Sequence, residues 1–233
     1  MSVRKLLNAS VTALAVVVAG GGIAACRGAE PPVVVPAPTL DNPKADGSLQ
    51  TAVVAGGCFW GIQGVFEHVR GVHKVLAGYS GGAGPTAQYE EVSTGRTGHA
   101  ESVQITFDPR QVSYGELLRI YFSVAHDPTQ LNRQGPDSGP QYRSAVFYAD
   151  ATQRRIAESY IAQLNQGKSF AEPVVTRVDA LKGFYPAEGY HQDFYLKNPD
   201  YPYIVVNDLP KIRNLQTLFP QYYLDRPVTT GIR

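Results

Sequence analysis

Cys58 stands where a cysteine can act as a nucleophile. It follows an apolar, β-prone segment and two glycines in the stretch VVAGGCFWGIQ, residues 53–63, and a helical pattern begins directly after it. The unpaired N–H groups at a helix N-terminus carry partial positive charge, which favours thiolate over thiol. The sequence therefore predicts a reactive cysteine with a lowered pKa, and glycines that let a reactant approach the sulfur. A buried structural cysteine is the alternative interpretation.

Two aromatic residues, Phe59 and Trp60, follow Cys58 directly, and Trp60 is the only tryptophan of the chain. Packing in the core is the ordinary role of such residues. The other interpretation is an apolar wall beside the sulfur, because aromatic rings attract sulfur and methyl groups. A wall of this kind would hold a methylthio group.

Glu101 is a candidate proton donor because of its place in the alternating segment 100–108. Val103, Ile105 and Phe107 share one face of this predicted strand, and the same alternation puts Glu101 on that apolar face. A poorly solvated carboxyl has a raised pKa, stays protonated near neutral pH and can act as a general acid. A frayed strand end that turns Glu101 toward water is the alternative.

Three further polar side chains lie in segments predicted to be loops. They are Tyr89 in AQYEE, and Asp137 and Tyr142 in GPDSGPQYRS. The chain has 14 tyrosines, so an isolated tyrosine carries little information. Most tyrosines pack with the hydroxyl at the rim of the core. The residues by themselves therefore assign no chemistry to these positions.

Two pairs of residues, His126 with Asp127 and Glu188 with His191, raise the question of a metal site. Their spacing matches no common arrangement of metal ligands. We therefore expect structural or capping roles for these four residues, and no metal.

Periodicity predicts a mixed or antiparallel sheet with helices packed on it, because some adjacent strands have no helix between them. The predicted strands cover residues 50–57, 72–80, 100–108, 142–149 and 173–180. The predicted helices cover residues 59–70, 113–126 and 151–166. Ser113 and Glu116 form a capping box, and Asp150 can cap the last of these helices. An α/β sandwich of the ferredoxin-like kind is the expected fold, with a mostly irregular region from Leu181 onward.

The composition fits one globular domain with an N-terminal extension. The chain has 233 residues, of which 43% are hydrophobic and 18% charged, and its formal charge is +1. A charge so close to zero gives no sign of a basic patch, so we expect no nucleic-acid partner.

The first 25 residues resemble a bacterial lipoprotein signal. Arg4 and Lys5 precede a short apolar run, and residues 23–26 read IAAC. We expect cleavage before Cys26 and lipidation of Cys26, which would anchor an exported, periplasmic protein to a lipid bilayer. A plain secretory peptide cut near the alanines, with Cys26 incidental, is the alternative.

The proline-rich residues 26–48 are predicted to form an extended tether, because proline disfavours both helix and strand pairing. A loosely ordered wrap around the domain is the alternative. The catalytic domain is expected over residues 49–233.

Taken together, these segments resemble the peptide-methionine (S)-S-oxide reductases, the A-type methionine sulfoxide reductases. The resemblance runs from about residue 52 to about residue 223. The stretches that carry it are GGCFWG, TGHAESV, HDPTQLNRQGPDSGPQYRSA, FYPAEGYHQDFYLKNP and YPYIVVNDLPK. GCFWG is highly specific, and GHAE and QYRS follow it in the right order. The resemblance implies an α/β sandwich and no metal or organic cofactor.

The resemblance also implies a reaction for the catalytic pair. Cys58 would attack the sulfoxide sulfur of methionine sulfoxide, in oxidised proteins or as the free amino acid, and Glu101 would protonate the departing oxygen. The products would be methionine and a sulfenic acid on Cys58.

The other candidates would bind the substrate. In the resemblance, the hydroxyls of Tyr89 and Tyr142 hold the sulfoxide oxygen, and Asp137 helps to fix substrate or water nearby. Phe59 and Trp60 would form the pocket for the methyl group of the substrate.

The chain departs from many members of the family because no cysteine follows Cys58. Those members carry further cysteines that convert the sulfenic acid to a disulfide, so this chain would need an external thiol reductant. Two other functions stay open. One is a cysteine hydrolase that pairs Cys58 with His99 or His191, and the other is a non-catalytic lipoprotein that binds oxidised proteins.

Overall fold

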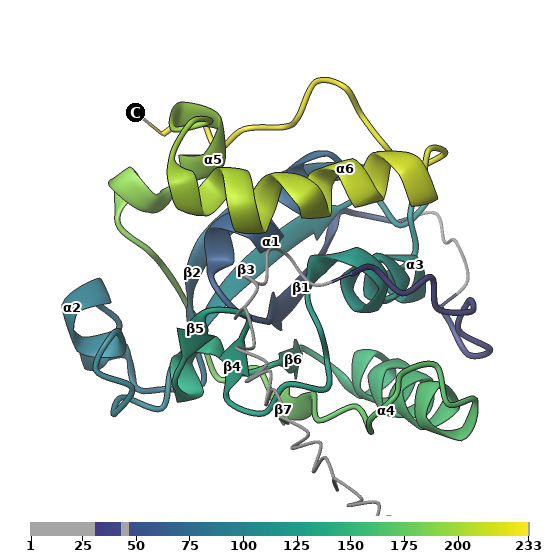
Figure 1. Cartoon of the computed structure of the whole chain (residues 1–233). Coiled ribbons are helices and arrows are strands. Elements are labelled where there is room, and N and C mark those ends of the chain that lie inside the picture. The colour runs from purple at the N-terminus through teal and green to yellow at the C-terminus, as the bar shows by residue number, and fades with distance from the viewer. Residues whose placement is uncertain (1–30, 43–46, 233) are drawn as a thin grey trace, which may run out of the picture.

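The computed structural model describes residues 31–42 and 47–232 of the chain (Figure 1). The expected signal sequence and Cys26 lie outside these residues. Within the described ranges, none of the helices combines the length and the apolar character that crossing a membrane requires.

A six-stranded mixed sheet forms the centre of the fold, with the strand order β7-β6-β1-β3-β2-β8. Neighbouring strands are antiparallel except for β6 and β7. The bounds are Gln50–Ala55 for β1, Val72–Ser80 for β2, Ala100–Phe107 for β3, Ala145–Tyr148 for β6, Arg177–Ala180 for β7 and Phe184–Pro186 for β8. The middle strands β6-β1-β3-β2 have the ferredoxin-like order 4-1-3-2. The α/β sandwich predicted from the sequence is therefore confirmed.

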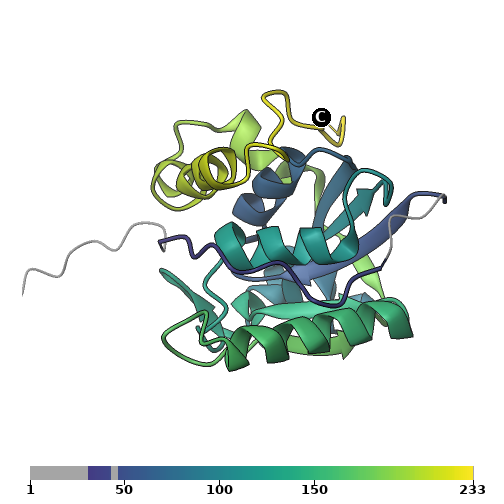
Figure 2. The ribbon, with the colours of Figure 1, turned by 90° about the vertical axis from the view of Figure 1, so that its right-hand side faces the viewer.

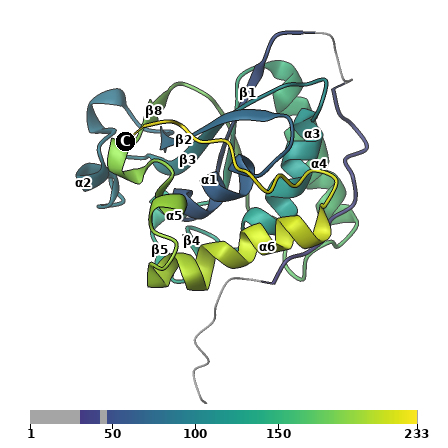
Figure 3. The ribbon, with the colours of Figure 1, turned by 90° about the horizontal axis from the view of Figure 1, so that it is seen from above.

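Helices pack on this sheet. Helix α1 lies on β2 and β3, and α6 crosses its outer side, whereas α4 packs against β6 and β7 (Figures 1 and 3). The helices are α1 Phe59–Glu67, α2 Tyr89–Val92, α3 Tyr114–Ile120, α4 Ala151–Gln166, α5 Phe194–Lys197 and α6 Leu209–Leu218. A π-helical turn extends α3 over Tyr121–Ala125, and another, Ile204–Asp208, leads into α6. A small hairpin pairs β4, Arg133–Gln134, with β5, Asp137–Ser138.

Both predicted helix caps are present. The Ser113 hydroxyl accepts the Glu116 N–H at 3.1 Å, and the Glu116 carboxylate accepts the Ser113 N–H at 2.7 Å. The Asp150 carboxylate accepts the N–H groups of Thr152 and Gln153. These caps satisfy donors that the first helical turn leaves without a partner.

The C-terminal region contains more regular structure than the sequence indicated. Beyond Leu181 the chain forms β8, α5 and α6. Pro210 lies in the first turn of α6, where the N–H that proline lacks would have no partner within the helix. Ile212, Leu215 and Phe219 are buried in the main core, and α6 packs against α1. Tertiary burial therefore stabilises a helix that local composition did not reveal.

Residues 33–42, here called the N-terminal strap, lie on the domain along α3 and α4 (Figure 2). The Val33 N–H donates to the Ser123 carbonyl at 3.1 Å, and the Val35 side chain is fully buried. Arg119 donates to the Val35 carbonyl at 3.0 Å. Of the two interpretations of the proline-rich segment, an extended tether and a wrap around the domain, the contacts of residues 33–42 fit the wrap.

The strap yields a stability prediction. Val35→Ala removes two buried methyl groups and should lower the free energy of unfolding by about 2 kcal/mol. Val34→Ala is the matched control, because Val34 is 53% exposed and its loss should change stability by less than about 0.5 kcal/mol. Urea denaturation of the two variants measures the difference. Equal stabilities would mean that the strap contributes nothing to the fold.

Candidate active site

Cys58 is the N-cap residue of α1, at the end of the loop that follows β1. Its position at a helix start is confirmed, and the residue is 8% exposed. Gly57 has a φ of +92°, which favours glycine. A Cβ atom at Gly56 would lie 2.8 Å from the His126 ring, and one at Gly57 would lie 2.6 Å from Gln134. The two glycines therefore make room for the side chains of His126 and Gln134.

The lowered pKa predicted for Cys58 is wrong for the free protein. Burial raises the pKa of the thiol well above its ordinary value, and the carboxyl groups of Glu101, Asp208 and Asp137 raise it further. The Trp60 N–H at the start of α1 acts in the opposite direction and is outweighed. The helix N-terminus is present, but desolvation and nearby negative charge dominate.

Glu101 lies on the buried side of β3 and is 3% exposed, as the alternation predicted. Its Oε2 accepts the Phe59 N–H, the first N–H of α1, at 3.0 Å. Burial raises the pKa of Glu101 to about 8, and Asp137 and Asp208 contribute to the rise while the Phe59 N–H lowers it. The carboxyl is therefore mostly protonated at neutral pH and can donate a proton beside Cys58.

Tyr89 and Tyr142 both lie within electrostatic range of Cys58 and Glu101. Burial raises the pKa of each phenol, and the charges of Glu101 and Cys58 are among the other causes. The Gly57 N–H donates to the Tyr142 carbonyl at 3.2 Å, which joins the Tyr142 turn to the Cys58 loop. The fold thus brings two phenols, from segments far apart in the chain, to the thiol and the carboxyl.

Asp137 comes to the same site from strand β5. Its carboxylate accepts a hydrogen bond from the Tyr203 hydroxyl. Burial raises the pKa of Asp137, whereas the Tyr203 hydrogen bond and the charge of Lys211 act to lower it. Tyr203 and Lys211 were not identified from the sequence, and nothing in the local pattern distinguishes Tyr203 from the other tyrosines.

The two aromatic residues after Cys58 have different surroundings. Phe59 is 1% exposed and packs 5.0 Å from the His191 ring and 5.9 Å from Tyr79, between ring centroids. Trp60 is only partly buried and stacks on Phe194 with ring centroids 3.8 Å apart. Trp60 therefore presents an aromatic wall, and Phe59 belongs to the core beneath it.

Structural roles account for the contacts of Glu188 and His191. Glu188 accepts the Tyr89 N–H at 2.9 Å and the Tyr79 hydroxyl at 2.8 Å. The Trp60 indole N–H donates to His191 Nδ1 at 3.2 Å. Both residues thus support the tyrosine and the tryptophan of the site. In the part of the chain that the structure describes, no three His, Cys, Asp or Glu side chains are grouped as a metal site would require.

The histidines proposed for a cysteine hydrolase are engaged elsewhere. His99 accepts the Gly82 N–H and bonds the Ala83 carbonyl, at 3.2 and 3.0 Å. His191 accepts the Trp60 indole N–H through Nδ1. The nucleophile–base pair of a cysteine hydrolase is therefore missing among the hydrogen bonds of these two residues.

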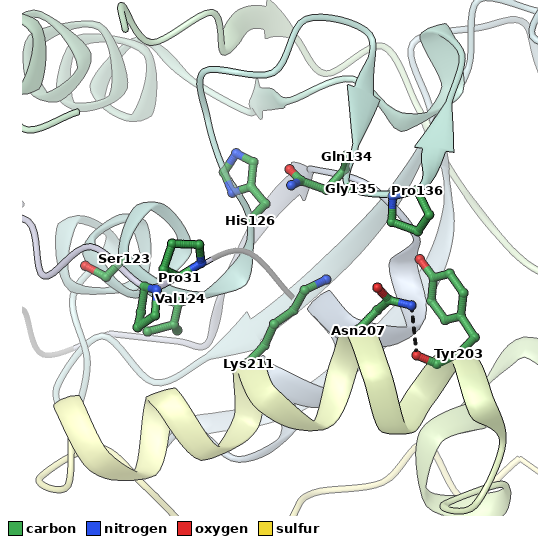
Figure 4. Close-up of a pocket in the computed structure, with 11 residues that line it drawn as sticks. Pro31, Ser123, Val124, His126, Gln134, Gly135, Pro136, Tyr203, Asn207 and Lys211 are labelled. Atoms are coloured by element: carbon green, nitrogen blue, oxygen red, sulfur yellow. Dashed lines mark hydrogen bonds between the residues drawn. The ribbon is translucent and has the colours of Figure 1, made fainter. Parts of the chain in front are cut away.

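A cavity lies beside the Cys58 loop (Figure 4). Lys211 extends from α6 toward Gln134, and Asn207 donates to the Tyr203 carbonyl at 3.1 Å on the same side. The wall of the cavity includes Gln134, which packs on Gly57, and Tyr203, whose hydroxyl donates to Asp137. The cavity therefore adjoins Asp137 through Tyr203, and the Tyr203 ring also packs edge-on against Trp60 with ring centroids 6.0 Å apart.

The comparison with known families gives one match over most of the domain. A family model described as peptide methionine sulfoxide reductase matches residues 50–222. A Mesorhizobium japonicum protein named peptide methionine sulfoxide reductase MsrA 2 is 61% identical over 189 residues, which cover 81% of this chain and 96% of that protein. The protein of the same name from Synechocystis sp. is 53% identical over 196 residues, covering 83% and 90%.

Solved structures agree with these sequence matches. Methionine sulfoxide reductase A of Corynebacterium diphtheriae is 34% identical with a TM-score of 0.56, covering 74% of this chain and 87% of that chain. Mxr1 from Saccharomyces cerevisiae in reduced form is 28% identical with a TM-score of 0.59, covering 72% and 96%.

Proposed function

The chain belongs to the peptide methionine sulfoxide reductase family, and from this premise we propose that it reduces the S epimer of methionine sulfoxide through a sulfenic acid on Cys58. Family membership makes it an oxidoreductase that acts on sulfur, reduces methionine sulfoxide and serves in the repair of oxidative damage. The epimer, the intermediate and the source of electrons are the parts that we propose.

One observation carries the proposal: a protonated carboxyl, Glu101, meets the Cys58 loop at the start of α1. The Cys58 sulfur attacks the sulfoxide sulfur while Glu101 donates its proton to the sulfoxide oxygen. The oxygen moves to Cys58, the sulfur–oxygen bond of the substrate breaks, and the proton of the thiol replaces the one that Glu101 gave. Sulfoxide and thiol thus become thioether and sulfenic acid, with no net change in protons.

Five residues would hold the substrate for this step. Tyr89 and Tyr142 are in electrostatic range of both catalytic groups, which suits phenols that donate to the sulfoxide oxygen. Asp137, held by a tyrosine, would fix substrate or water. Trp60 would face the methyl group with Phe59 packed behind it, because an apolar ring attracts a methylthio group. A chiral pocket of this kind accepts one sulfoxide epimer.

Electrons would come from an external thiol. The sequence has no cysteine after Cys58, and a lipid thioether on Cys26 would leave that sulfur unable to react. One reductant thiol would attack the sulfenic sulfur, forming a mixed disulfide and water. A second thiol would then release Cys58 and leave a disulfide of the reductant. Neither step uses a metal or an organic cofactor.

We further propose that the enzyme is exported and anchored. Residues 1–25 would be removed as a signal, and acyl chains on Cys26 would hold the protein at a bilayer facing the periplasm. The basic start, the apolar run and the IAAC sequence support this proposal.

A single-turnover experiment tests the reaction. Without reductant, the protein should form about one equivalent of methionine from the S epimer, because no second thiol follows Cys58. Dimedone should then label Cys58, as it reacts with sulfenic acids. The R epimer and the variant Cys58→Ser are the controls, and neither should yield methionine. Repeated turnover without added thiol, or methionine formation by Cys58→Ser, would contradict the proposal.

Replacing Glu101 tests its role as the acid. Glu101→Gln should slow single-turnover reduction about 100-fold or more at pH 7, the usual effect of a general acid. In the unaltered enzyme the rate should fall as the pH rises through about 8, because Glu101 then loses its proton. The variant should lose this fall. Glu67→Gln, a buried acid at the far end of α1, is the matched control and should keep both rate and pH profile.

Intact-mass analysis of protein from bacterial membranes tests the anchor. The expected mass is that of a chain beginning at an acylated Cys26. Cys26→Ser should abolish the lipid and release the enzyme from the membrane fraction without loss of reductase activity. An unmodified N-terminus at any position would contradict lipidation.

A further inference from the structure

An ion pair at the start of α6, between its N-cap residue Asp208 and Lys211, has no part in the reaction described so far. The Lys211 Nζ lies 3.4 Å from Asp208 Oδ1, three residues earlier in the chain. Asp208 is fully buried and Lys211 is 8% exposed. The second carboxylate oxygen of Asp208 is buried and has no hydrogen-bond partner among residues 31–42 and 47–232. A buried charge that is only half satisfied reduces stability, so its position calls for a functional reason.

The position of Asp208 is fixed by a glycine in the first turn of α1. A Cβ atom at Gly61 would overlap the Asp208 carboxylate and lie 3.0 Å from the Lys211 Nζ. Cys58 precedes Gly61 by three residues, and positions three apart lie on the same side of a helix with Cβ atoms about 5–6 Å from each other. The Asp208 carboxylate therefore sits beside the helix start that carries the thiol.

The ionisable groups around Cys58 are mostly acids. Besides Asp208, the thiol faces Glu101 from β3 and Asp137 from β5. The phenols of Tyr89, Tyr142 and Tyr203 also lie within range of the sulfur. Lys211 is the cation that acts on Asp137 and Asp208. With Glu101 protonated, Asp208 is one of the two carboxylates that oppose ionisation of the thiol at neutral pH.

We propose that the Asp208–Lys211 pair is a positioning element that keeps Cys58 in its thiol form until a substrate occupies the site. Lys211 holds Asp208 ionised although it is buried, and the ionised carboxylate disfavours a second negative charge at Cys58. Bound sulfoxide takes up the Glu101 proton, so the thiol proton has a vacant carboxylate to move to, and Cys58 can then react although Asp208 keeps its charge. The inference rests on the proposed role of Cys58 as the nucleophile.

This restraint suits an enzyme in which no second cysteine follows Cys58. Thiolates react with oxidants and electrophiles much faster than thiols do. A resting thiolate at Cys58 would be oxidised without benefit, and the chain after Cys58 offers no second cysteine to trap the sulfenic acid as a disulfide before further, irreversible oxidation. A carboxylate beside the sulfur keeps it unreactive until the sulfoxide is in place.

The test is the pH dependence of iodoacetamide alkylation, in which a sulfur–carbon bond forms and iodide leaves. In the unaltered enzyme the half-maximal rate should lie above pH 9, since the pKa of Cys58 is raised above that value. The double variant Asp208→Asn/Lys211→Met replaces the ion pair by neutral side chains of similar size. Its profile should move down by about one pH unit, giving about tenfold faster alkylation at pH 7.

The single variant Lys211→Met should give the same shift as the double variant, because Asp208 without its cation takes up a proton. A shift in the opposite direction would show that Asp208 stays ionised without Lys211 and would overturn this assignment. Glu67→Gln is the control: burial raises the pKa of Glu67 to about 10, so it carries no charge at pH 7, and it ends α1 far from Cys58.

Thermal denaturation of each variant separates this effect from a structural one. A folded double variant with the alkylation profile of the unaltered enzyme would overturn the proposal. Alkylation needs no sulfoxide, so the result stands apart from the reductase assay. If alkylation shifts while methionine is not formed, the proposed function fails and the control of the thiol holds.

Discussion

The hydrogen bond from the Phe59 N–H to the Glu101 carboxyl is the contact on which the arrangement of the site depends. It joins the first residue of α1 to the start of β3, two points 42 residues apart in the chain. The register of the sheet makes it possible. Strands β1 and β3 are antiparallel with Ala55 opposite Ser102, so the loop that follows β1 runs beside the beginning of β3. Backbone pairing therefore brings the Cys58 loop and Glu101 together.

Burial at this point acts on both partners in the same direction. It raises the pKa of the Glu101 carboxyl and the pKa of the Cys58 thiol, so both groups hold their protons at neutral pH. For Glu101 this is the state that a proton donor requires. For Cys58 it is the opposite of an activated nucleophile, although the residue occupies the N-cap position of α1. The helix N-terminus can favour a thiolate only when something removes the negative charge around it.

The sequence predicted features that depend on neighbouring residues and missed features that depend on contacts between distant segments. Strand alternation was enough to predict that Glu101 is buried. A strand, two glycines and a helical pattern were enough to predict that Cys58 lies at a helix start. The pKa of Cys58 could not be predicted this way, because the burial that raises it depends on the whole fold and the carboxyl groups that add to it come from β3, β5 and the turn before α6. Asp208 and Lys211 were within reach of sequence reasoning. Opposite charges three residues apart in a helical segment commonly form an ion pair. The burial of this pair, however, follows from α6 packing on α1.

A site in which Glu101 and Cys58 both hold their protons can transfer oxygen while buried, because the transfer needs no change in the net charge of the site. Oxygen transfer from sulfoxide to thiol needs a proton on the oxygen and releases one from the sulfur. In the proposed reaction Glu101 gives the first proton and receives the second, so the net charge of the pocket would be the same before and after. The desolvation that raises the pKa of both groups therefore disfavours neither the reactants nor the products. It disfavours only the ionised states between them. Donors placed in advance at the oxygen are what such a step needs, and the phenols of Tyr89 and Tyr142 lie in range of both catalytic groups.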